Sequence, residues 1–98
     1  MQIEYIIYVR RVDGDNETHE VLDSGTDELR AIVRRAIRDL GVVSSGPGSY
    51  PANSWQSDYH DEDREYFERG ILKYYTLLLP SLSTHNCARI NRLIAAAR

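Results

Sequence analysis

Alternating apolar residues at the start of the chain predict a β-hairpin. Residues 2–10 are rich in β-branched and aromatic side chains, which favour strands. Their alternation gives one fully apolar face and one half-apolar face, as expected for a strand inside a sheet. Asp13-Gly14 predicts the turn, because glycine tolerates positive φ. Residues 17–23 then form a weaker and more polar returning strand.

A helix is expected directly after the hairpin. Apolar residues recur at helical spacing over residues 29–40, and Gly41 is a typical helix stop. Ser24 or Thr26 is expected to cap the start, and the two acidic residues that follow suit the positive end of the helix dipole. The pattern therefore predicts a helix that begins within residues 24–28.

Residues 41–57 form a long connection rich in glycine, serine and proline. Loops of this length are uncommon in compact domains and are often functional. Tyr50 and Trp55 are large groups within it, and we expect them to pin the loop to the core; the alternative is that they contact a ligand. Part of residues 53–59 is a candidate for a third short strand. This prediction is left open, because the nearby Pro51 disfavours a strand.

A second helix is predicted over residues 60–79. Its apolar residues share one stripe at first and then spread nearly all round, which is typical of a central, buried helix. A buried strand over residues 71–79 is the alternative, since periodicity alone does not separate the two. Pro80 ends either element, and Ser81 or Ser83 caps a third helix. The inward side of that helix is expected to carry Cys87, Ile90, Leu93, Ile94 and Ala97.

Together these elements predict one compact α+β domain over residues 1–98. Its N-terminal antiparallel β-hairpin, with the third short strand left open, packs against about three α-helices. A chain of 98 residues builds one modest core. That core is expected to contain Ile3, Tyr5, Ile7, Val9, Leu29, Val33, Ile37, Leu40, Phe67, Ile71, Tyr74, Leu78, Ile90 and Ile94.

Composition narrows the class of protein. Hydrophobic residues make up 42% and charged residues 28% of the chain, which argues against disorder over its whole length. No apolar run approaches the ~20 residues of a membrane span, and the N-terminus lacks the pattern of a signal peptide. A single cysteine, Cys87, excludes an internal disulfide and a multi-cysteine zinc site. We therefore expect a cytoplasmic protein with no membrane partner, no metal and no cofactor.

Charge is unevenly distributed along the chain. The net charge of −3 disfavours a general nucleic-acid binder, which is usually basic. Residues 58–68 hold six acids and one arginine, with tyrosines interleaved. The simpler explanation is internal compensation of charge, and the alternative is a surface for a partner. The candidate partner-binding residues are Asp58, Tyr59, Asp61, Glu62, Asp63, Glu65, Tyr66 and Glu68.

Arginines form a second candidate surface. Residues 30–38 hold four arginines and no acid until Asp39, and no acid follows residue 81. If the first and third helices pack side by side, their arginines form one basic face that suits nucleic acid or a phosphorylated ligand. The alternative is a solvated face. The candidate anion-binding residues are Arg30, Arg34, Arg38, Arg89 and Arg92.

The candidate catalytic groups lack an arrangement. Cys87 is expected on an inward helix face, where cysteine acts as a small apolar residue, and His85 points to another side of the helix. The carboxylates around His60 lie at an exposed helix start, with nothing to raise their pKa values. His60 itself lacks the spacing or the glycine turn of a metal site. We assign no catalytic residue and no metal ligand.

The function predicted from these features is that of a small non-enzymatic binding protein. Such an inhibitor or adaptor docks on a macromolecular partner, expected to be a protein or a nucleic-acid-binding complex, through the acidic surface of residues 58–68. The alternative is nucleic-acid or phosphorylated-ligand binding through the arginine faces, and a small hydrolase or transferase is third. A homodimer is left open, because two clear strands leave a sheet edge to cover.

In size, single-domain form and lack of a catalytic signature, the chain resembles small phage or mobile-element accessory proteins. Such proteins often inhibit a host complex, including CRISPR effectors. The resemblance rests on these general features, and it implies an anti-defence, anti-CRISPR-like inhibitor as one example of the predicted class.

Overall fold

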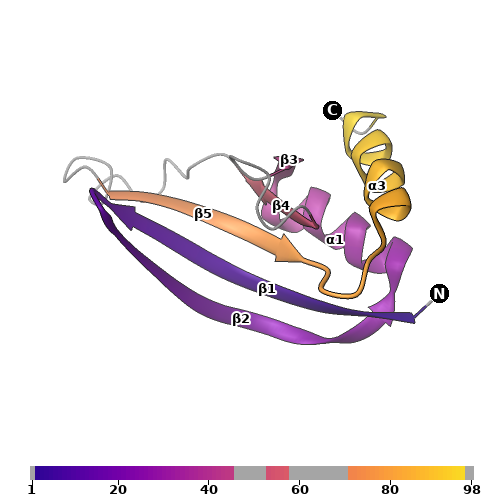
Figure 1. The fold of residues 1–98 in the computed structure, drawn as a ribbon, viewed down its shortest axis with the longest axis horizontal. Coiled ribbons are helices and arrows are strands. Elements are labelled where there is room, and N and C mark those ends of the chain that lie inside the picture. Colours follow the sequence, from indigo (N-terminus) through magenta and orange to yellow (C-terminus); the bar gives the residue numbers. More distant parts are fainter. Residues whose placement is uncertain (1, 46–52, 58–70, 97–98) are drawn as a thin grey trace.

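The computed structural model describes residues 2–45, 53–57 and 71–96 (Figure 1). The elements are β1 (Gln2–Asp13), β2 (Asn16–Glu28), α1 (Leu29–Leu40), β3 (Val42–Ser45), β4 (Ser54–Ser57), β5 (Ile71–Leu78) and α3 (Thr84–Ala96). The predicted α+β class is confirmed. The prediction of about three helices on a small hairpin is wrong, because these residues hold two helices and a five-stranded sheet.

The described strands belong to one antiparallel sheet with the order β2-β1-β5-β4-β3. The predicted hairpin is present: β1 and β2 pair from Gln2 to Asp13, and Gly14 adopts a φ of 60° in the turn. The short strand left open within residues 53–59 is present as β4. Because the sheet has five strands, a homodimer is no longer needed to complete a two-stranded hairpin.

β2 is longer than predicted and includes the residues expected to start the first helix. Residues 24–28 extend β2 and pair with the first residues of β1. α1 begins at Leu29 without a side-chain cap, so the predicted cap at Ser24 or Thr26 is wrong. The physical reason is that β1 begins at Gln2, and the backbone N–H and C=O groups at its start need a partner strand. Residues 24–28 provide that partner. The predicted stop is confirmed, since Gly41 adopts the left-handed conformation with a φ of 66°.

Residues 71–78 form strand β5 and not the second half of a helix. The alternative of a buried strand over residues 71–79 is therefore the correct one. β5 lies between β1 and β4, with Leu77 opposite Ile7. A near-continuous apolar and aromatic run is typical of such an interior strand. The remainder of the predicted helix, residues 60–70, lies outside the described residues.

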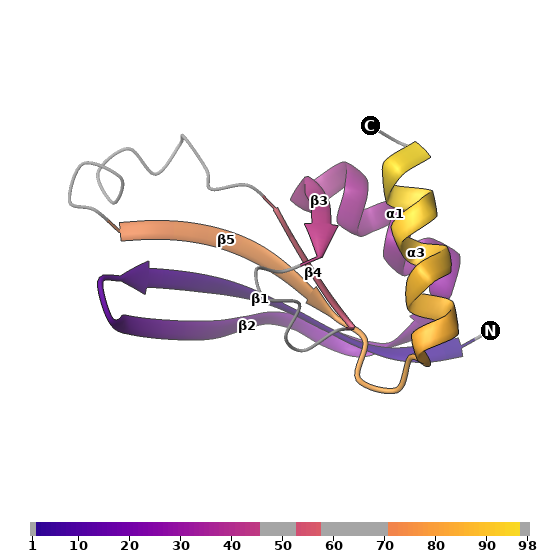
Figure 2. The same cartoon turned by 45° about the horizontal axis from the view of Figure 1, so that its top comes forward.

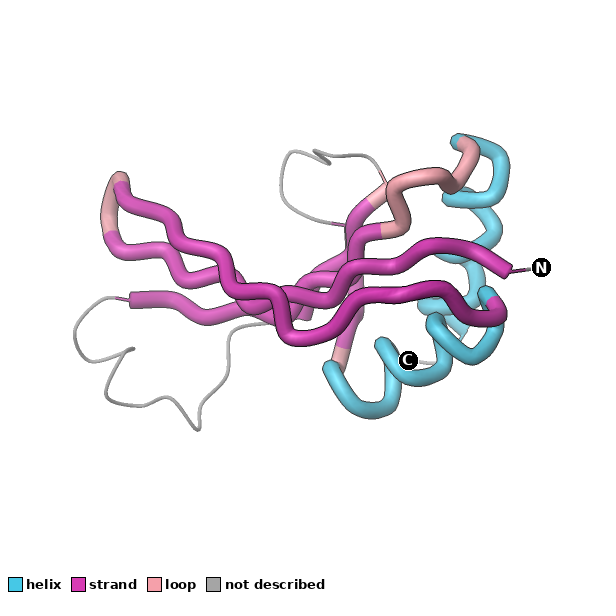
Figure 3. The backbone as a smooth tube through the Cα atoms, turned by 90° about the horizontal axis from the view of Figure 1, so that it is seen from below, coloured by secondary structure: helices cyan, strands magenta, loops and turns pink. Residues whose placement is uncertain are grey.

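The two helices cover one face of the sheet near one end. α1 and α3 lie on the same side of the sheet, near the N-terminus, whereas the β1–β2 turn lies at the far end (Figures 1 and 2). Seen from below, both helices lie at the end of the sheet that holds the N-terminus, and the β1–β2 turn lies at the other end (Figure 3). The molecule measures 41 × 24 × 23 Å, and the long strands account for its elongation. Within the described ranges, no helix is long and apolar enough to cross a membrane.

The core lies between this sheet face and the two helices. It draws on every described element except β2, and on the turn that follows β5. Its buried side chains are Ile3, Ile7, Ile32, Val33, Ala36, Val42, Trp55, Leu77, Leu79, Leu82, Cys87, Ile90 and Ile94. Four further members of the predicted core pack against its margin, namely Tyr5, Leu29, Ile37 and Leu40.

Two core predictions and one prediction of an inward-facing residue need correction, and each follows from element geometry. Tyr74 and Leu78 are half-buried and lie on the opposite face of β5 from Leu77, because side chains alternate along a strand. Leu93 was expected inward, and it is 50% exposed. Phe67 lies outside the described residues.

Trp55 ties α3 to the sheet. Its side chain is fully buried, and its indole Nε1–H donates a hydrogen bond to Asn91 Oδ1 at 2.6 Å. The expectation that Trp55 pins its segment to the core is thus confirmed, whereas Tyr50 lies outside the described residues. Because Trp55 belongs to β4 and Asn91 to α3, this contact holds α3 against the β3–β4 side of the sheet.

A polar cluster ties α1 to β2. Arg35 Nη1 donates to Asp23 Oδ2 at 2.7 Å, and the Tyr5 hydroxyl donates to the same oxygen at 3.1 Å. Gly25 lies opposite Tyr5 in the sheet, and a Cβ at this position would contact the tyrosine ring. The hydrogen bonds from Arg35 and Tyr5 lower the pKa of Asp23.

We expect Asn91→Ala to destabilise the fold by about 1–3 kcal/mol, because it leaves the buried indole N–H of Trp55 without its acceptor. Trp55 is the one tryptophan of the chain, so its fluorescence reports the unfolding transition in urea. The matched control is Arg92→Ala, an exposed neighbour on α3 that should change stability by less than about 0.5 kcal/mol. Equal effects of the two substitutions would contradict the role given to this contact.

We expect the stabilising effect of Asp23 to disappear in acid. Its folded-state pKa lies below that of the unfolded chain, so its stabilisation is complete above about pH 4 to 5 and is lost as the pH falls through the folded-state value. Asp23→Asn should therefore be less stable than the parent at neutral pH, with a gap that closes in acid. Urea unfolding across this pH range measures the gap, with Asp15→Asn in the hairpin turn as control. A gap that does not vary with pH would contradict the prediction.

Candidate functional site

α1 presents two neighbouring rows of side chains beside α3. One row is basic: Arg30, Arg34 and Arg38 recur every four residues, so successive positions advance about 6 Å along the helix axis. The other row is apolar and contains Val33 and Ile37. Residues four apart lie above one another on a helix, and so each row forms a continuous ridge.

These rows and one residue of α3 form a shallow groove of about 410 Å³, which we call the basic groove. Val33 is buried and Ile37 is half-buried, so they form its apolar floor. Leu93 of α3 forms a wall. The lining residues are Arg30, Val33, Arg34, Ile37, Arg38 and Leu93.

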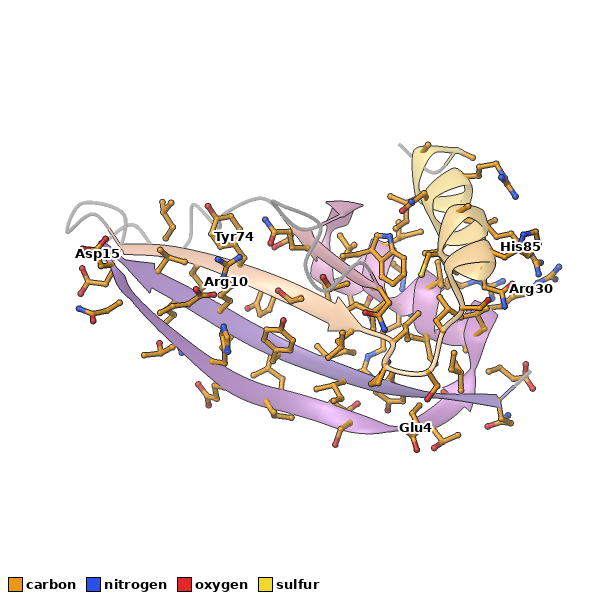
Figure 4. All side chains as sticks on the ribbon, viewed as in Figure 1. Glu4, Arg10, Asp15, Arg30, Tyr74 and His85 are labelled. Carbon is orange, nitrogen blue, oxygen red and sulfur yellow. The ribbon has the colours of Figure 1, made fainter. Side chains whose placement is uncertain are left out.

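A smaller hollow of about 80 Å³ lies between the two helices next to the basic groove. Arg30 borders both hollows, and Arg89 of α3 borders the smaller one. Figure 4 shows Arg30 at the helical end of the molecule, far from Asp15 at the tip of the hairpin. Four of the five arginines proposed as one basic face thus surround these hollows, and the fifth, Arg92, lines neither of them.

Leu93 is the member of the site that the sequence places on the inward side of its helix. The buried side of α3 is formed by Cys87, Ile90 and Ile94. Each residue turns a helix by about 100°, so Leu93 lies at the margin of that side. The available signal was the spacing: Cys87, Ile90 and Ile94 already complete a helical stripe, which leaves Leu93 outside it.

The arginines of the hairpin are paired with acids. Arg10 contacts Glu17, and Arg11 Nη1 lies 3.2 Å from Glu20 Oε2. His19 Nε2 also lies 3.0 Å from Glu17 Oε1, and the contacts with His19 and Arg10 lower the pKa of Glu17. The charges of β1 and β2 therefore compensate each other across the strands.

The arginines of the basic groove are largely without such partners. Arg38 Nε lies 3.0 Å from Oδ1 of its neighbour Asp39. Arg30 and Arg34 of the groove, and Arg89 beside the smaller hollow, make no ion pair with any other residue that the structure describes. The groove thus combines an apolar floor with positive charge that is not compensated within this part of the chain.

The groove is suited to binding and not to proton transfer. Arginine keeps its charge at every physiological pH, and the other lining residues that the structure describes are aliphatic. Cys87 is buried beneath α3, and burial raises the pKa of its thiol, which makes it a poor nucleophile. Residues 2–45, 53–57 and 71–96 contain no group of three or more side chains that could hold a metal ion.

The acidic candidate surface, residues 58–68, lies outside the described residues. Its role as a partner surface therefore stays a prediction from the sequence.

Comparison with protein-family models, with curated proteins and with solved structures finds no match to this chain. The fold and the site therefore define its class by themselves: an α+β domain whose described residues form a five-stranded antiparallel sheet, two helices on one face and a basic groove beside α1.

We expect Arg34→Glu to raise the melting temperature by about 2–4 °C, because it replaces repulsion between like charges with attractive pairs to Arg30 and Arg38. Arg34→Gln, which removes the repulsion alone, should give a smaller rise. Both effects should shrink at high salt, which screens exposed charges. Thermal unfolding followed by circular dichroism measures them. A loss of stability in Arg34→Glu would show that Arg34 has a structural role.

Proposed function

We propose that the protein is a small non-enzymatic binding protein, an adaptor or inhibitor, whose basic groove holds an acidic segment of a partner protein. The observation that supports this proposal is the arginine row beside an apolar floor, in which Arg30 and Arg34 have no ion pair with any described residue. A surface that is both charged and apolar matches a protein segment that carries carboxylates and aliphatic or aromatic side chains.

The floor of the groove favours a protein over a nucleic acid as the partner. Single-stranded nucleic acids stack their bases on aromatic side chains, whereas Val33, Ile37 and Leu93 are aliphatic. The chain also carries a net charge of −3, which opposes association with a long polyanion. A short acidic segment meets the arginines without bringing a large negative charge close to the rest of the molecule.

The proposal keeps the predicted class of function and moves the contact surface. From the sequence alone, the acidic residues 58–68 are the first candidate surface and the arginine faces are the second. The arginine faces are favoured now because α1 and α3 bring four arginines around two adjoining hollows. The acidic stretch stays available as a second contact region of the same binding protein.

The test compares partner capture by charge variants. The tagged protein, Arg30→Glu/Arg34→Glu and Arg92→Glu are each mixed with nuclease-treated lysate, and retained proteins are quantified by mass spectrometry. We expect a defined protein to be retained by the parent and by Arg92→Glu, and to be reduced at least about tenfold by the double substitution, since two arginine contacts are replaced by repulsion. Salt should release it, because about 1 M salt shortens the Debye length to about 3 Å.

Photocrosslinking from two positions places the partner on the molecule. A photoreactive residue at Leu93, 50% exposed in the wall of the groove, should crosslink to the retained protein. The matched control is Leu22 of β2, which is 48% exposed and is not part of the groove. Equal crosslinking from both positions, or retention of nucleic acid in the absence of any protein, would overturn the proposal.

A further inference from the structure

We infer that the segment held in the basic groove is an amphipathic α-helix, with an acidic row and an apolar row on one side. This inference rests on the proposed function and names the conformation and the residue pattern of the partner. It follows from the arrangement of the lining residues, from the absence of a strand among the described residues that line the groove, and from the length of the arginine row.

The two rows of the groove lie next to each other on the same surface. The arginines at 30, 34 and 38 form one row, and Val33 and Ile37 form the next. A helix presents residues i and i+3 together with i+4 and i+7 on one side, so it faces both rows at once. An extended strand presents every second residue on one face, in a single file, and therefore matches one row or the other.

The described walls of the groove offer no backbone partners to an extended segment. All six lining residues within the described part of the chain belong to α1 or α3, and helices hydrogen-bond their interior backbone groups internally. A bound strand gains much of its affinity from backbone hydrogen bonds to an exposed sheet edge. A bound helix satisfies its own backbone groups and needs only side-chain contacts, which is what this groove supplies.

The length of the arginine row sets the length of the partner helix. Arg30 and Arg38 are eight positions apart, which corresponds to about 12 Å along α1. Acids at i, i+4 and i+8 of a partner helix repeat the same advance of about 6 Å per step. The half-exposed Leu93 then fits beside the apolar row of that helix, as in ridge-into-groove packing.

The test reads the residue pattern directly from selected peptides. A display library of random peptides of about 15 residues, roughly four helical turns, is selected on the parent protein. Binders that also bind Arg30→Glu/Arg34→Glu are removed, whereas binding to Arg92→Glu is retained as the control for overall charge. We expect the enriched peptides to carry acids at four-residue intervals and apolar residues three positions after them.

The affinities of one enriched peptide complete the test. Its fluorescein conjugate should bind at least tenfold more tightly than a scrambled peptide of equal composition and than a version with a central proline, and its helical circular dichroism signal should rise on binding. Enriched acids with a period of two, or equal binding by the scrambled and proline peptides, would overturn the helical partner and leave the proposed function standing. A library without groove-dependent binders would also overturn the helical partner. Tighter binding of a single-stranded oligonucleotide than of any peptide would overturn it as well.

The proposed function fails on a different measurement. It is contradicted when crosslinking from Leu93 is no stronger than from Leu22, whatever pattern the peptide library gives. The two conclusions are therefore separated by experiment.

Discussion

The structure depends on the pairing of β5 between β1 and β4. This pairing brings Leu77 opposite Ile7 on one side and opposite Trp55 on the other, so that three large side chains meet on one face of the sheet. An apolar patch of this kind has to be covered, and α1 and α3 cover it. The hydrogen bond from Trp55 to Asn91 then fixes the position of α3. The hydrogen bond from Arg35 to Asp23 fixes the position of α1. The groove beside α1 is therefore a consequence of how the sheet is assembled.

Structural features that depend on local sequence signals could be predicted from the sequence. The hairpin turn at Gly14, the stop at Gly41 and the third of the predicted helices all depend on short-range chemistry, and each is present. Ser83 illustrates this, because its hydroxyl accepts a hydrogen bond from the backbone N–H of Asn86 at the start of α3, as an N-cap does. β5 was ambiguous because an apolar run buried in an interior strand has no periodicity that separates it from a buried helix.

Long-range strand pairing accounts for the remaining differences between the predicted and the observed elements. Residues 24–28 carry good helix-start chemistry, yet they pair with the N-terminal end of β1, 26 residues away for the Gln2–Glu28 pair. The choice between starting a helix and pairing with β1 is not visible in the local sequence, because the partner strand lies far away in the chain. The arginines of the site were visible in the sequence as a charge pattern. The floor of the groove could not be predicted, because Val33 and Ile37 belong to the same apolar stripe of α1 as its core residues.

The distribution of ion pairs links the fold to the proposed function. The chain has 15 acids and 12 basic residues, so acids are in surplus. The described structure uses them to pair Arg10, Arg11 and Arg35, and Arg38 has its neighbour Asp39. Arg30 and Arg34, which repel each other at four-residue spacing, are left without such a partner in the described residues. A row of like charges that the fold does not compensate is at best neutral for stability. Its placement along an apolar floor is instead what a binding surface for an acidic, partly apolar segment requires.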